Sequence, residues 1–244
     1  MIFSDVALQN KKILVTGASS GIGRQIAICL SKTGAKLVLT GRNRTELKKT
    51  QFQLITCSST IISADLTNEE QLQKVFTFAT EDGIKLDGMV YSSGVIPTIP
   101  LRNTSKEKLF SVFDINIISF IIACKYFCKN SVKESGSIVG ISSIASVRPE
   151  KCQSLYAATK GAMNSAVQAL AIELADKNIT INTVLPGVTA LKNHDSEEVD
   201  RLSEKQLFGA VDADDVASMC AFLLSDCAKH ITGRQFYCDN GRFL

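Results

Sequence analysis

The sequence has little of what marks several common classes of protein. It contains only two histidines and therefore offers a poor basis for a histidine-rich metal site. The formal net charge is only +3 and no run of five like charges occurs, so we expect no nucleic-acid partner. The first residues lack the basic start, apolar stretch and cleavage site of a signal peptide, which favours a cytoplasmic protein.

Long apolar runs and paired cysteines are also scarce. The apolar segment from Ile115 to Cys124 is far shorter than the roughly 20 residues that span a bilayer, so we expect a buried helix and no membrane contact. The eight cysteines include no CxxC pair, and most lie within apolar patterns. We therefore expect buried, reduced thiols rather than disulfides.

What the chain does have is an alternation of apolar runs and amphipathic stretches. Amphipathic segments long enough for helices separate these runs, which are Lys12 to Thr16, Lys36 to Thr40, Thr60 to Ala64, Leu86 to Tyr91, Ser137 to Ile141, Ile179 to Leu185 and Gln235 to Cys238. Such strands are buried on both faces, and their order predicts a parallel sheet. We expect an α/β, three-layer, doubly wound fold with about seven strands in one domain, residues 1–244.

A glycine-rich turn follows the first apolar run and opens the first predicted helix. Its sequence is Thr16-Gly17-Ala18-Ser19-Ser20-Gly21-Ile22-Gly23. Glycine lets the backbone approach a pyrophosphate closely, and a helix N-terminus offers free N–H groups and the positive end of its dipole. The position between strand and helix favours a dinucleotide site over the alternative, a tight turn without a ligand.

Two side chains suited to proton transfer lie on a later predicted helix, Ser154 to Asp176. Tyr156 and Lys160 are four residues apart and project from one face. A nearby ammonium favours the tyrosine anion, so we expect Lys160 to lower the pKa of Tyr156. Ser143 lies thirteen residues before Tyr156, just after the fifth apolar run, where it could stabilise charge on a substrate oxygen. Alone, a Tyr-x-x-x-Lys pair is weak evidence.

Together these motifs resemble the short-chain dehydrogenase/reductase family over nearly the whole chain, and most closely the 3-oxoacyl-carrier-protein reductase type. The resemblance rests on the GxxxGxG spacing and on Gly140-Ile141-Ser142-Ser143 with Tyr156 and Lys160. It implies a Rossmann fold and catalysis by Ser143, Tyr156, Lys160 and Asn116, the last binding a water that relays protons. A satisfied structural amide is the alternative for Asn116, and Ser142 is expected to be a local turn residue.

The resemblance also implies where the cofactor binds. The residues expected to hold it are Gly17, Ser19, Ser20, Gly21, Ile22, Gly23, Asp65, Leu66, Ser92, Gly94, Tyr156, Lys160, Pro186, Gly187, Val188 and Thr189. Asp65 is expected near the adenine amino group, with a helix N-cap as the alternative. The segment 186–189 is expected to fix the nicotinamide carboxamide.

The segment after the second apolar run predicts which cofactor is used. An acidic residue about 20 positions after the glycines usually binds the ribose 2′-hydroxyl of NAD. Here Gly41-Arg42-Asn43-Arg44 contains no carboxylate, and a guanidinium binds phosphate through a fork of donors. We therefore expect NADP rather than NAD, with Arg42 as the main contact, although a solvated loop arginine is the alternative.

Three features depart from the family pattern. Tyr91-Ser92-Ser93-Gly94 replaces the usual Asn-Asn-Ala-Gly, Leu191 stands where a threonine is common, and the expected substrate lid, residues 189–210, is short. Three functions stay open: reduction of a 3-oxoacyl or small ketone substrate, oxidation or reduction of a sugar, steroid or other free alcohol, and a non-catalytic nucleotide-binding subunit. The resemblance also implies a homodimer or homotetramer.

Overall fold

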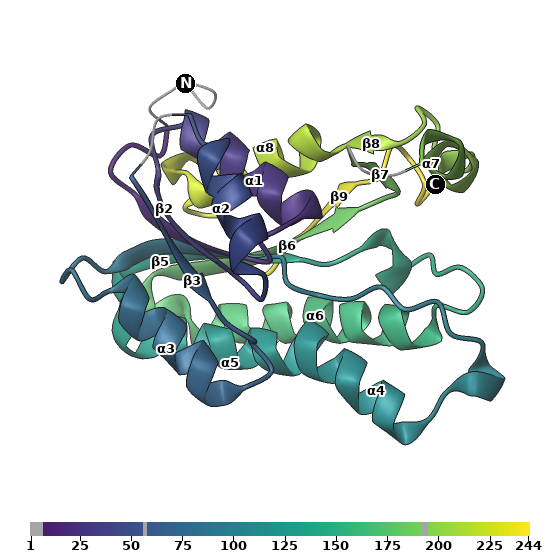
Figure 1. Cartoon of the computed structure of the whole chain (residues 1–244), viewed down its shortest axis with the longest axis horizontal. Helices are drawn as coiled ribbons and strands as arrows, with labels where there is room; N and C mark the ends of the chain where they lie inside the picture. The colour runs from purple at the N-terminus through teal and green to yellow at the C-terminus, as the bar shows by residue number, and fades with distance from the viewer. Residues whose placement is uncertain (1–6, 56–57, 192–194) are drawn as a thin grey trace.

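A parallel sheet forms the centre of the protein. The structure, a computed structural model, describes residues 7–55, 58–191 and 195–244. Seven strands are hydrogen-bonded in the order β3-β2-β1-β4-β5-β6-β9 and run parallel throughout (Figure 1). Their bounds are β1 Lys12–Thr16, β2 Lys36–Gly41, β3 Ser59–Ser63, β4 Leu86–Tyr91, β5 Val132–Ile141, β6 Ile179–Pro186 and β9 Gln235–Cys238. The predicted doubly wound α/β fold is confirmed.

Helices cover both faces of the sheet (Figure 1). One face carries α1 (Gly21–Lys32), α2 (Arg44–Phe52) and α8 (Ala213–Leu224). The other carries α3 (Glu69–Ala79), α4 (Lys106–Phe113), α5 (Ser119–Tyr126) and α6 (Ser154–Glu173). Short helical turns complete the chain: η1 Leu101–Asn103, η2 Asp114–Ile118, η3 Phe127–Ser131, η4 Ile144–Ser146, η5 Ala175–Lys177 and η6 Asp226–Ala228.

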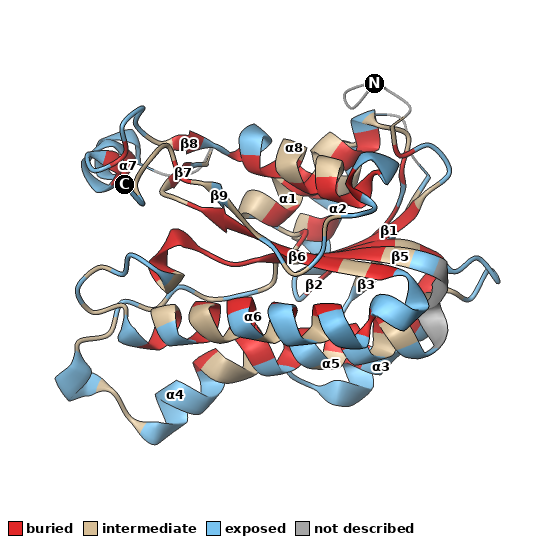
Figure 2. Cartoon of the chain, turned by 180° about the vertical axis from the view of Figure 1, so that it is seen from behind, coloured by how far each residue is buried: buried red, intermediate tan, exposed pale blue. Residues whose placement is uncertain are grey.

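Each face of the sheet has its own apolar core. Successive strand side chains point to opposite faces, so Leu14 of β1 packs against one helical layer while Ile13 and Val15 pack against the other. All five β1 residues are buried, as Figure 2 shows for the sheet interior. This double burial explains why β1 appears in the sequence as a continuous apolar run. The edge strands β3 and β9 contain no buried residue, so the expectation of burial on both faces was wrong for them.

The apolar segment around α5 is only partly a buried helix. Residues Lys106–Lys129 form one helical stretch that is long and apolar enough to cross a membrane by length and composition alone. Phe120 and Phe127 are completely buried in the core, which accounts for much of this apolar character. Ile118 and Ile121, however, are 47% and 40% exposed, so the expectation of a buried helix was wrong for this edge.

The expected lid contains some regular structure. A two-stranded ladder pairs β7 (Thr189–Ala190) with β8 (Val211–Asp212), and α7 (Ser196–Ser203) lies between them in the chain. Residues 192–194 of this segment lie outside the described residues. The ladder and α7 lie together at one end of the molecule in Figure 1.

The described cysteines are all free, as expected. Cys124 and Cys220 are buried, but Cys227 is exposed and the others are partly exposed, so the expectation of buried thiols holds for only two of them. Cys57 lies outside the described residues.

Candidate active site

A cavity of about 1030 Å³ opens at the carboxyl ends of the central strands. All predicted cofactor residues line it, and so do Ser143, Tyr156 and Lys160, although these residues come from segments far apart in the sequence. This is the edge at which open parallel sheets bind their ligands, because the strand-to-helix loops converge there. Asn116 is the exception among the predicted residues, since it does not line the cavity.

The glycine-rich turn is packed too closely for larger residues. Gly17 and Gly21 have φ values of +65° and +55°, which favour glycine. A Cβ on Gly23 would lie 2.3 Å from the Gly17 carbonyl oxygen. Ser20 occupies the N-cap position of α1, yet its side chain makes no capping hydrogen bond. The first N–H groups of the helix are therefore not capped by this serine, which suits an anion-binding role.

The carbonyl groups of this turn are held by α2 and by α1. Thr50 Oγ1 donates to the Ala18 carbonyl at 2.7 Å. Arg24 donates from Nη2 to the Ser19 carbonyl and from Nε to Thr50 Oγ1, and it also pairs with Glu46. This network satisfies two turn carbonyls on the side of α2 and so ties the glycine turn to the helix that follows Arg42.

Arg42 lies at the cavity edge with an exposed side chain. Asn43 follows it and caps α2 by accepting a hydrogen bond from the Glu46 N–H at 3.1 Å. Arg44 is the first residue of α2 and does not line the cavity. Of the two arginines after β2, only Arg42 is thus available to a ligand in the cavity.

Asp65 is not the helix N-cap that the sequence left open as its alternative role. Its Oδ1 accepts from the Thr67 N–H at 3.1 Å and the Thr67 hydroxyl at 2.8 Å, while the N-cap of α3 is Asn68. These hydrogen bonds, and more weakly the charge of Arg42, lower the pKa of the Asp65 carboxyl. Asp65 is therefore an ionised turn residue that also lines the cavity.

The segment that departs from the family pattern after β4 is held through its backbone. The N–H groups of Ser92 and Ser93 donate to Thr16 Oγ1 at 3.1 and 3.2 Å. The buried Tyr91 hydroxyl donates to the Ile115 carbonyl at 2.8 Å. A threonine hydroxyl and a tyrosine hydroxyl thus anchor this segment to β1 and η2.

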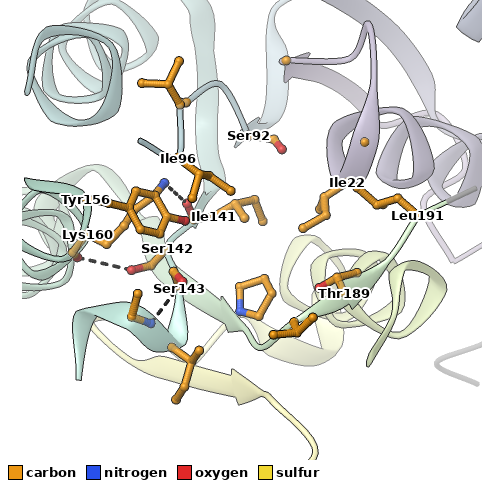
Figure 3. A pocket seen from close by; sticks show the side chains of 18 of the residues that line it. Ile22, Ser92, Ile96, Ile141, Ser142, Ser143, Tyr156, Lys160, Thr189 and Leu191 are labelled. Carbon is orange, nitrogen blue, oxygen red and sulfur yellow. Dashed lines mark hydrogen bonds between the residues drawn. The ribbon is translucent and has the colours of Figure 1, made fainter. Parts of the chain in front are cut away.

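Tyr156, Lys160 and Ser143 meet at one wall of the cavity (Figure 3). Tyr156 and Lys160 share one face of α6, and the ammonium lies 5.8 Å from the tyrosine ring centroid. Ser143 follows β5, and its Oγ accepts from the Ala145 N–H at 3.1 Å. This hydrogen bond does not use the Ser143 hydroxyl proton, which faces Tyr156.

The electrostatics of this wall differ from the expectation. Burial raises the pKa of the Tyr156 hydroxyl, and the facing Ser143 hydroxyl lowers it in part. Lys160 donates to the Ile141 carbonyl at 2.7 Å, and burial lowers the pKa of its ammonium to about 8. The dominant influence on Tyr156 is thus burial rather than Lys160, and the tyrosine is a protonated acid at neutral pH.

Neighbouring polar residues support this wall. Ser142 Oγ donates to the Lys160 carbonyl at 3.2 Å, which is the local structural role expected of it. Asn116 is completely buried in η2: its Oδ1 accepts from the Val95 N–H at 2.8 Å, and its Nδ2 donates to the Val95 carbonyl and to Thr159 Oγ1. Both of its amide protons are used, so its side chain acts as a satisfied structural amide.

Several cavity residues have no signal in the local sequence. Arg148, Gln153 and Arg242 line the cavity, the last from the C-terminal segment. Arg242 donates to Glu150, which also pairs with Lys205 at 2.9 Å. These contacts join segments separated by 92 and 55 residues, a separation at which no spacing rule operates.

Comparisons with known proteins agree with this geometry. A family model described as enoyl-(acyl carrier protein) reductase matches residues 17–242. The 3-oxoacyl-acyl-carrier-protein reductase FabG of Rickettsia felis is 31% identical, with 98% of this chain and 99% of that protein covered. The L-xylulose reductase of Caenorhabditis elegans is 30% identical, with 95% of each chain covered.

A solved structure gives the same result. It is titled as a short-chain dehydrogenase/reductase, glucose/ribitol dehydrogenase, from Brucella melitensis, and superposes with a TM-score of 0.91 at 30% identity, covering 99% of this chain and all of that one. Sequence family, fold and cavity therefore agree. The chain belongs to the short-chain dehydrogenase/reductase family of oxidoreductases, whose members use a nicotinamide cofactor.

Proposed function

We propose that this protein is an NADP-dependent reductase that converts a ketone to an alcohol. The observation that carries the proposal is the meeting of Ser143, Tyr156 and Lys160 in the same cavity as the glycine-rich turn. A proton donor and a hydrogen-bond donor thus lie within one cavity with a dinucleotide cradle. The close approach of Gly23 to Gly17, and the first turn of α1 without a side-chain cap, fit a pyrophosphate bound beside the glycine-rich turn.

The residues of this chain would share the reaction as follows. When bound, the cofactor supplies the hydride. Tyr156 donates its hydroxyl proton to the carbonyl oxygen, and its raised pKa keeps that proton in place at neutral pH. Ser143 donates a second hydrogen bond to the same oxygen and stabilises the charge that develops there. Lys160 provides a positive charge behind the tyrosine.

The preference for NADP rests on Arg42. A guanidinium forms charge-assisted hydrogen bonds with a 2′-phosphate, and the segment Gly41–Arg44 has no carboxylate that would repel it. In a fluorescence titration, we expect tight NADPH binding, weak NADH binding, and a loss of NADPH affinity of about 10- to 100-fold in Arg42→Ala. Arg44→Ala is the matched control, because Arg44 does not line the cavity. Equal binding of both cofactors by the wild type would refute the role of Arg42.

The walls near Tyr156 favour a substrate with an apolar part next to its ketone. Ile96 and Ile141 lie beside Tyr156 in the cavity (Figure 3). Other apolar side chains line the rest of the cavity: Ile144, Leu191 and Leu202. Charged side chains of both signs also line the cavity, among them Arg148, Lys151, Glu198 and Glu204, so the charge of the rim favours no particular carrier. The apolar side chains beside Tyr156 suit the acyl part of a 3-oxoacyl thioester.

A substrate panel tests this choice. We expect acetoacetyl-CoA to be reduced with a higher kcat/KM than either xylulose or diacetyl, with NADPH in each assay. A higher value for xylulose would favour a sugar reductase. No turnover with any carbonyl substrate, in a protein that binds NADPH, would favour the non-catalytic alternative.

We further propose that the protein is a cytoplasmic homo-oligomer. The exposed Ile118 at the end of η2, Ile121 of α5 and the 81% exposed Ile172 of α6 support the proposal of an oligomer. Exposed apolar groups on neighbouring helices are a common feature of subunit interfaces. Light scattering on purified protein would distinguish a monomer of 26.4 kDa from a dimer or tetramer.

A further inference from the structure

Gln206 holds the segment after β6 by an unusual side-chain contact. It lies between α7 and β8, is 5% exposed, and does not line the cavity. Its Oε1 accepts from the Val188 N–H at 2.5 Å, and its Nε2 donates to the Val188 carbonyl at 3.2 Å. The same Nε2 donates to the Gly209 carbonyl at 2.7 Å. One carboxamide thus binds both polar groups of a single residue's backbone.

Gly187 makes this contact possible. A Cβ at this position would lie 2.4 Å from Gln206 Oε1 and 3.0 Å from the Asp239 Cα. No larger residue fits there unless Gln206 moves. Gly187, which the sequence predicted as a cofactor-binding residue, is therefore required by its close contact with the Gln206 side chain.

The contact determines which way the neighbouring peptide faces. Val188 points its N–H and carbonyl towards Gln206, and its carbonyl also accepts from the Val211 N–H of β8 at 2.8 Å. In extended backbone the polar groups of successive residues point in opposite directions. The Thr189 N–H therefore points away from Gln206 and β8, and Thr189 lines the cavity on that side.

We propose that Gln206 is a positioning residue for the nicotinamide end of the cofactor. It fixes the backbone of residues 187–189 so that Thr189 presents its N–H to the carboxamide group. This inference rests on the proposed function, because it requires a nicotinamide dinucleotide in the cavity. Gln206 itself does not touch the cofactor, so its substitution should affect one end of the cofactor selectively.

Two ligands separate the two ends of the cofactor. Oxidised NADP carries the nicotinamide, whereas adenosine 2′,5′-bisphosphate has only the adenosine and phosphate groups. In isothermal titration calorimetry, we expect Gln206→Met to weaken NADP binding about tenfold and to leave the bisphosphate Kd within about twofold. Hydrogen exchange in the cofactor-free protein should become faster at Val188 in the same variant.

Asn240→Gly is the matched control. Asn240 Nδ2 donates to the Gly209 and Ala210 carbonyls, so it anchors the same segment without contacting Val188. Its φ of 47° suits glycine, so the change adds no backbone strain. We expect this variant to bind both ligands like the wild type. Equal weakening of NADP in Asn240→Gly and Gln206→Met would overturn the proposal.

A second variant gives a result that would not arise if the Gln206 side chain only filled space. In Gln206→Glu, an ionised carboxylate faces the Val188 and Gly209 carbonyls and has no proton to donate. Protonation restores one donor and one acceptor, so NADP affinity should recover as the pH falls from 8 to 5.5, relative to the wild type. Weakening of both ligands in Gln206→Met, or no recovery in Gln206→Glu, would contradict the assignment. Failure of the wild type to bind either ligand would instead overturn the proposed function.

Discussion

Replacing Lys160 should change how the stability of the cofactor-free protein depends on pH. Burial lowers the pKa of its ammonium from 10.5 to about 8. Between these values, the unfolded chain binds a proton that the folded protein has released, so stability rises with pH in this window. Below pH 8 both states are protonated, and the buried charge costs about 3 kcal/mol, at 1.36 kcal/mol per pKa unit.

The Lys160→Met variant isolates this contribution. Integrating the proton linkage predicts that the free energy of unfolding of the wild type, relative to Lys160→Met, rises by about 1.3 kcal/mol between pH 7 and pH 9. The variant also loses the hydrogen bond to the Ile141 carbonyl, which changes its absolute stability at every pH. Only the change of the difference with pH is therefore used, because it reports the proton that Lys160 releases on folding.

Urea unfolding at pH 7, 8 and 9 measures the slope. Lys49→Met is the control, because Lys49 lies on the surface with a side chain that is 60% exposed. The difference in the free energy of unfolding between Lys49→Met and the wild type should change little between pH 7 and pH 9. A flat difference for Lys160→Met, or one that falls with pH, would show that the ammonium is not desolvated as the structure indicates.

Three further changes test other parts of the site. Tyr156→Phe should lower kcat by about 10²–10⁴-fold while the Kd for NADPH stays within about twofold, because only the proton donor is removed. Loss of turnover with retained NADPH binding supports this role, and unchanged turnover refutes it. Gly23→Ala should weaken NADPH binding more than tenfold, since its Cβ would lie 2.3 Å from the Gly17 carbonyl oxygen, and wild-type affinity would contradict the close packing of the turn. Ile121→Lys should reduce the mass in light scattering if α5 forms a subunit interface, whereas an unchanged oligomer would place the interface elsewhere.

Local chemistry made much of this protein predictable. The strands β1, β4 and β9 have the predicted bounds. For β1 and β4 the reason is that a strand buried on both faces is a continuous apolar run. Tyr156 and Lys160 share a face because four residues make about one helical turn. The glycine turn was visible because positive φ values and close backbone contacts restrict the residue type.

Contacts between distant segments determined the rest. Three contacts join residues that no local spacing relates: Asn116 with Val95, Gln206 with Val188, and Arg242 with Glu150. The exposed edge of α5 and the dominant effect of burial on Tyr156 likewise depend on how the layers pack. Sequence periodicity reports which residues can be buried, whereas the pKa of a group and the direction of a peptide depend on what folding brings next to them.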